Sequence, residues 1–192
     1  MLGAITRTAC GCALAVGAVL GTCTCGASTP APPGASVANK DKNVMEKLRE
    51  IVAKAARNPD AYPDLEIVYE RGHALSGTIH FSARASGAYA LASNATMGRK
   101  PGTWSGQLSR PQRQTVLDLV ATHGIVGLAS STRSIGDDEE PVAVTVRQGG
   151  MSHTTTLWHG DAARSSQFHP FEAQWLALLK QLSGGAIVAT AN

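Results

Sequence analysis

The sequence predicts an α+β domain in which an antiparallel sheet of about five strands is covered on one face by two helices. Short runs rich in β-branched and aromatic residues follow one another across tight turns, which is typical of antiparallel pairing. Two further segments carry one apolar stripe each at helical spacing, so each needs a sheet face to cover it. The predicted order over 64–183 is β-β-β-α-β-β-α, preceded by one more helix.

This preceding helix is expected over 41–58. Its apolar residues share one stripe at three- and four-residue spacing, and Asn58-Pro59 ends it because the residue before a proline avoids the α region. The stripe consists of Val44, Leu48, Ile51, Val52 and Ala55. It either docks on its own domain or binds a partner, and the sequence leaves both readings open.

The first three strands are followed most easily through their turns. They are expected over 65–70, 78–84 and 88–94. A three-residue loop, Ala85-Ser86-Gly87, pairs Phe81 with Leu91 and gives the sheet one apolar face, whereas a two-residue turn would put them on opposite faces. The loop also puts Gly87 where a left-handed conformation is needed.

Both covering helices have recognisable ends. Ser109 and Gln112 form a capping box before a helix expected over 110–123, and Gly124 is its natural C-terminal cap. The last helix is expected over 169–182, where aromatic residues and leucines form one stripe, and the tail over 184–192 is expected to fray.

The clearest hairpin turns at Gly149-Gly150, a two-residue turn between β-rich runs. Its strands are expected over 141–148 and 151–158. Counting outward from the turn pairs Val146 with His153 on the core side. The same count puts Arg147 and Trp158 on the opposite, polar face.

The chain begins like an export signal. Arg7 precedes an apolar run of 12 residues over 9–20, and small residues follow it. A helix over this run spans roughly 18 Å, which is short of the ~30 Å hydrocarbon core, so a permanent membrane span is not expected. All four cysteines lie in this part of the chain, at Cys10, Cys12, Cys23 and Cys25.

The order Leu20-Gly21-Thr22-Cys23 resembles the lipobox of bacterial lipoproteins. The resemblance implies removal of the signal over 1–22 and attachment of fatty acyl chains, such as palmitate, to Cys23. A Ser/Pro/Ala/Gly-rich segment over 23–40 would then act as a solvated tether. The expected location is the cell envelope, periplasmic and membrane-anchored. The alternative is ordinary cleavage after Ala27, which would release a soluble secreted protein.

The domain itself has a second resemblance. A Ser-Gly-x-Tyr turn, a Gly-x-Leu-Ser helix start and a Gly-Gly hairpin are similar to features of small exported bacterial domains of unknown function, over roughly 65–182. These motifs are turns and caps. The resemblance therefore implies a fold and carries no catalytic residue.

Net charge and cysteine content limit the classes of function and the sources of stability that fit this domain. The net charge falls from +3 to +2 once Arg7 leaves with the signal, and no Lys/Arg run remains. Nucleic-acid binding therefore has no electrostatic support. Beyond the signal and its exit the domain has no cysteine pair, so it must be held together by its core.

No motif specifies a reaction or a cofactor. The histidines lack metal-binding spacing, and the acidic run over 137–140 lacks the alternation of a calcium loop. Two rival hypotheses stay open. One is a hydrolase that assembles His153 or His159 with a serine by folding, and the other is a histidine-based metal-binding envelope protein.

The favoured hypothesis is a non-enzymatic, membrane-tethered domain that binds a protein or another envelope component. Its candidate contact residues are Trp104, Arg147 and Trp158, because exposed tryptophan and arginine are enriched at interfaces. Trp104 lies in Lys100–Gly106, a segment of loop composition. The simpler reading of both tryptophans is that each seals an edge of the core.

The lipobox resemblance predicts the N-terminus of the cellular protein. We expect mass spectrometry of that protein to find a terminal peptide that begins at Cys23 and carries acyl chains. A cellular form that still begins at Met1 would contradict both the location and the tether.

Overall fold

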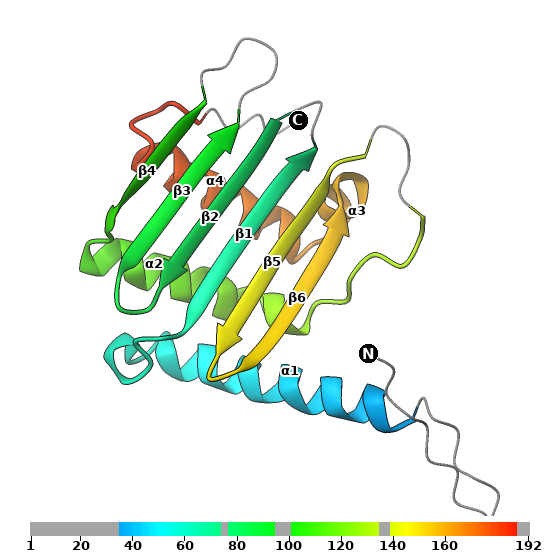
Figure 1. Ribbon diagram of the computed structural model, residues 1–192. Coiled ribbons are helices and arrows are strands. Elements are labelled where there is room, and N and C mark those ends of the chain that lie inside the picture. The colour runs from blue at the N-terminus through cyan, green and yellow to red at the C-terminus, as the bar shows by residue number, and fades with distance from the viewer. Residues whose placement is uncertain (1–34, 74–76, 95–100, 135–138, 188–192) are drawn as a thin grey trace, which may run out of the picture. The chain divides into compact units, whose positions relative to one another are not determined.

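The computed structural model describes residues 35–73, 77–94, 101–134 and 139–187, and they form one α+β unit (Figure 1). The helices are α1 (Ala35–Ala55), α2 (Arg110–Thr122), α3 (His159–Arg164) and α4 (Phe168–Leu182), with short 3-10 turns η1 (Pro59–Ala61) and η2 (Ile125–Gly127). The strands are β1 (Glu66–His73), β2 (Gly77–Arg84), β3 (Ala88–Asn94), β4 (Gly102–Gln107), β5 (Pro141–Gln148) and β6 (Met151–Trp158).

All six strands form one antiparallel sheet in the order β4-β3-β2-β1-β5-β6. The α+β class is therefore confirmed, and the sheet has one strand more than the sequence predicted. The additional strand is β4, where a loop was expected. Glycine, proline and serine hid it, but Thr103, Trp104 and Ser105 alternate across the sheet, and Trp104 pairs with Leu91 on the helix side.

The predicted register of the first hairpin is confirmed. Phe81 pairs with Leu91 and Ala83 with Tyr89, around the loop Ala85-Ser86-Gly87. Gly87 has a φ of 106°, a conformation that side chains with a Cβ rarely adopt. One face of this hairpin is thereby committed to the core.

The β5–β6 hairpin also has the predicted register, with Val146 opposite His153. Gly149 and Gly150 have φ values of 54° and 80°, so both central residues are left-handed, as in a type I′ turn. Arg147 and Trp158 accordingly lie on the face away from the helices.

The helices cover one face of the sheet, and Figure 1 looks onto the other (Figure 1). The Ser109–Gln112 capping box starts α2 as predicted. Helix α1 docks on its own domain, because Leu48, Val52 and Ala55 are buried in the shared core. The covering layer is thus α1, α2 and α4.

The start of α1, the segment after α4 and one additional helix differ from what the sequence predicted. Helix α1 begins at Ala35, inside the expected tether, because residues 35–40 lie beyond the last tether proline, Pro33, and contain none themselves. Ile187, in the expected frayed tail, is buried, and its amide donates to Ser183 Oγ. Helix α3 was not predicted. The remainder of the predicted tether and tail lies outside the described residues.

Trp175 of α4 lies at the centre of the core and is fully buried. Its ring centroid lies 5.8 Å from that of Tyr69, 5.5 Å from Phe81 and 5.1 Å from Phe171. The edge-to-face contact with Phe81 is one of the preferred aromatic geometries. This aromatic group joins the last helix to the middle of the sheet.

The docking of α1 on the sheet can be tested by shortening one of its buried side chains. Replacing buried Leu48 with alanine should lower the free energy of unfolding by about 2–5 kcal/mol, as cavities in cores do. Lys47→Ala, an exposed neighbour, should change it by less than about 0.5 kcal/mol. Denaturant titration measures both, and a neutral Leu48→Ala would mean that α1 does not pack on the domain.

Candidate functional site

The two edge strands of the sheet differ in the hydrogen bonds that other described segments make with them. The segment after η2 lies along the outer edge of β6. The Ser131 amide donates to the Thr156 carbonyl over 2.9 Å, and the Trp158 amide donates to Ser131 Oγ over 3.1 Å. The Thr156 amide donates to Ser130 Oγ over 3.0 Å. These bonds occupy the outward-facing N–H and C=O of Thr156 and the N–H of Trp158, so the C-terminal half of this edge is covered.

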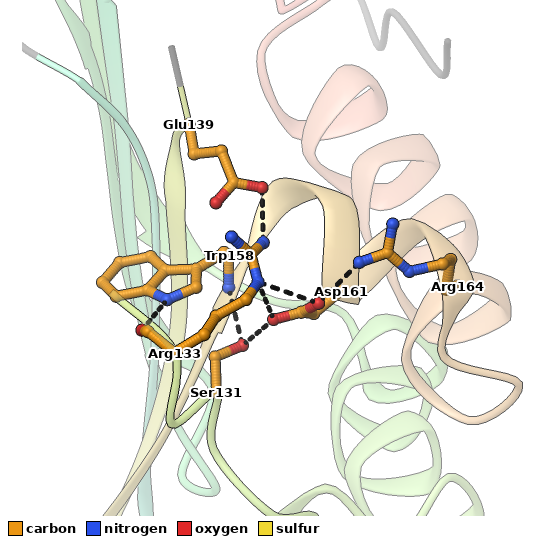
Figure 2. Close-up of polar contacts among 6 residues, drawn as sticks. All are labelled: Ser131, Arg133, Glu139, Trp158, Asp161 and Arg164. Carbon is orange, nitrogen blue, oxygen red and sulfur yellow. Dashed lines mark hydrogen bonds and ion pairs between the residues drawn. The ribbon is translucent and has the colours of Figure 1, made fainter. Parts of the chain in front are cut away.

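Asp161 of α3 holds that cover in place (Figure 2). Ser131 Oγ donates to Asp161 Oδ2 over 2.6 Å, while Arg133 Nε lies 3.1 Å from the same oxygen. Arg164 donates to Oδ1 over 2.8 Å. These hydrogen bonds, that of Ser131 foremost, lower the pKa of Asp161 because they favour the carboxylate.

Trp158 is part of the same cover. Its indole N–H donates to the Arg133 carbonyl over 2.9 Å, and Arg133 also donates to Glu139 (Figure 2). The Glu139 hydrogen bond raises the pKa of Arg133. Trp158 is half-buried. The geometry therefore fits the simpler interpretation, in which Trp158 seals a sheet edge, better than it fits a residue free to contact a partner.

Strand β4 forms the opposite edge, and no backbone hydrogen bond from another described segment reaches its outer side. The Leu108 amide donates inward to the Gly87 carbonyl over 2.9 Å. Because inward- and outward-facing residues alternate in an antiparallel pair, the N–H and C=O groups of Thr103, Ser105 and Gln107 face outward. An edge of this kind is a template for a further strand.

The side chains of β4 do not guard this edge. Native edges are commonly protected by charged residues, proline or a bulge. The strand Gly-Thr-Trp-Ser-Gly-Gln carries no charge and no proline, and it pairs with β3 without a bulge. Trp104 is half-buried on the helix side, where it packs against the core and over Gly102.

The three predicted contact residues do not form one site. Trp104 and Trp158 lie on opposite edge strands, which five strand spacings place about 24 Å apart. Arg147 lies on the open face and is held by Glu66, with Nη1 3.0 Å from Oε2. Of the three, only Trp104 lies on an edge that no other described segment covers.

The hydrolase hypothesis pairs His153 or His159 with a serine. His153 Nε2 and His159 Nδ1 are both buried and have no hydrogen-bond partner among the described residues. Burial lowers the pKa of His153, although the charge of Asp41 opposes the shift. The described residues also contain no group of three or more His, Cys, Asp or Glu placed to hold a metal ion.

A buried polar group joins β1 to α4. Tyr69 donates to Glu172 Oε1 over 2.9 Å, and Arg71 Nη1 lies 3.3 Å from the same oxygen. Burial raises the pKa of Tyr69 well above its usual range, and the Glu172 carboxylate adds to the shift. Every member has a partner, so the group orients α4 on the sheet and leaves nothing poised for chemistry.

The chain matches no protein-family model, and a search of curated proteins returns no similar sequence. Among the described residues no helix is both long and apolar enough to cross a membrane. Any functional inference therefore depends on the geometry described above.

Sequence reasoning missed the free edge because it missed β4. The alternation Thr103-Trp104-Ser105 was a usable signal, but glycines on both sides favoured a loop reading. It also missed Ser131 and Asp161, which are 30 residues apart and carry no motif.

The edge cover of β6 yields a prediction. Asp161→Asn should weaken the Ser131 contact, so the Thr156 and Trp158 amides should exchange with solvent faster at neutral pH. NMR hydrogen exchange measures this, with Glu46→Gln on the exposed side of α1 as the control. Unchanged exchange would mean that Asp161 does not hold the cover.

The same carboxyl gives a pH dependence with a defined sign. Since folding lowers its pKa, its stabilisation is fully present above the ordinary value of about 3.9 and is lost as the pH falls through the lowered value. Acid titration of stability should therefore show a smaller loss in Asp161→Asn than in the wild type.

Proposed function

We propose that this chain is a lipid-anchored, extracytoplasmic binding domain that takes an extended segment of a protein partner as a seventh strand along β4. The observation that carries the proposal is the contrast between the two edges. Ser130 and Ser131 occupy outer backbone groups of Thr156 and Trp158 at the end of β6, and no described segment does this for β4.

The outer side of β4 suits an extended peptide. Thr103, Ser105 and Gln107 offer outward N–H and C=O groups in alternation, which is the pattern that an added strand reads through main-chain hydrogen bonds. The strand carries no charge, so it would repel neither acidic nor basic segments. Affinity would come from the backbone, and side chains beside the edge would supply selectivity.

Trp104 would supply that selectivity on the helix side. It is half-buried, so part of its ring remains for an apolar residue of the incoming strand to cover. On the other side of the sheet, β3 and β4 carry short side chains next to the edge at Ala90, Ala92, Thr103 and Ser105, with the longer Gln107 at the end of β4. Large partner side chains could lie flat there.

The anchor half of the proposal rests on the lipobox resemblance at Cys23. An acylated N-terminus would confine the domain to a membrane surface and raise its effective concentration towards partners on the same membrane. The mass of the N-terminal peptide tests this half separately from the edge.

Ser105→Pro tests the edge. Proline removes an outward N–H and leaves the bonds to β3 in place, so the fold should persist while an added strand loses a hydrogen bond and meets the ring. In a pull-down with the intact lipidated protein, recovery of the bound partner should fall at least about tenfold. Ser105→Ala, which keeps the N–H, should recover as much as the wild type.

Two results would contradict this proposal. One is full recovery of the partner by a folded Ser105→Pro protein. The other is a wild-type dimer in sedimentation that Ser105→Pro dissociates, because the occupant of the edge would then be a second copy of this chain.

A further inference from the structure

A pocket opens where α1, the end of α2 and η2 meet, on the helical side of the domain and away from the β4 edge. Its volume is about 250 Å³. Its floor is apolar and rigid, because Val52, Val120 and Val126 are each no more than 2% exposed. Concave, mostly apolar sites between helices with a few polar groups are the usual form of small-molecule sites.

The pocket exists because three small residues stand where these elements converge. Ala53 and Ala121 face it from α1 and α2, and Gly124 lies at the turn between α2 and η2. Gly124 has a φ of 61°, a conformation that a residue with a Cβ would adopt only with strain. Ala53 is exposed, so the space opens to solvent.

One charged side chain lines the pocket. Arg49 of α1 extends across to Gly127 at the end of η2, where a methyl group added to the glycine would lie 3.5 Å from Nη1. No hydrogen bond or ion pair to a described residue holds its guanidinium. A guanidinium presents donors in a planar fork that matches a carboxylate.

Two acids on these helices are engaged elsewhere, and Glu46, three residues before Arg49 on α1, forms no ion pair with it. Glu50 lies 2.6 Å from Lys54, and Asp118 accepts from Gln114 over 2.9 Å. Capping of the α2 C-terminus by Arg49 would be another use of the charge, but no described carbonyl accepts from it. Arg49 is therefore an exposed cation beside an apolar pocket, with no ion-pair partner in the described part of the chain.

We propose that this pocket binds an aliphatic monocarboxylate, with the chain on the valine floor and the carboxylate on Arg49. An apolar cavity of about 150 Å³ accommodates the six carbons of benzene, so 250 Å³ corresponds to about ten heavy atoms, the size of octanoate. This site is independent of the proposed β4 interface, since it lies among the helices.

Photo-crosslinking of the full lipidated chain with a diazirine analogue of octanoate tests the site. Cross-links should map by mass spectrometry to peptides that contain Val52 or Val126. Unlabelled octanoate should compete, whereas octanol, which has the same chain without the charge, should compete at least about tenfold less well. Arg49→Gln should reduce labelling by a similar factor, and Lys47→Gln, on an exposed part of α1, should not.

Ala121→Phe provides a second variant, because the ring would fill the pocket while the arginine stays in place. It should abolish labelling in a protein that circular dichroism shows to be folded. Equal competition by octanol, labelling elsewhere on the chain, or unchanged labelling of Arg49→Gln would each overturn the proposal. Ser105→Pro should label like the wild type, which separates this test from that of the β4 edge.

Discussion

The packing of Trp175 against Tyr69 and Phe81 is the contact on which the rest of this structure depends. It places α4 over the two central strands, β1 and β2. The Tyr69–Glu172 hydrogen bond adds a polar contact between the same helix and β1. Burying a carboxylate beside a tyrosine is acceptable only because Arg71 lies at the same oxygen. With α4 fixed, α2 and α1 fill the remaining helical layer.

The helices cover one face of the sheet but not its edges, so the edge strands are the surfaces on which the functional argument depends. A six-stranded sheet has two edges, and each presents a row of unpaired backbone groups unless something covers it. At β6 the cover is a segment fixed by an aspartate, two arginines and a serine. At β4 the strand is neutral and short. The same physical constraint thus acts on both edges, and among the described residues a segment outside the sheet meets it only at β6.

Much of the fold could be predicted from the sequence, but little of the candidate site could. The register of both hairpins followed from the glycine turns and the need for one apolar face, and the capping box at Ser109 fixed the start of α2. Strand β4 could not be predicted in this way, because its residues pair with β3 through contacts that a loop-like composition concealed. Trp104 was singled out from the sequence, but its place on an open edge was not.

Local patterns by themselves therefore determined the elements, their order and which side of each faced inward. They act over a few residues, where backbone preferences and side-chain spacing are sufficient. Tertiary structure alone decided that Ser131 meets Asp161, that the described chain covers the end of β6 but not β4, and that Arg49 lies beside a pocket between helices. Those relations join residues far apart in the chain, and only folding brings their atoms within reach of one another.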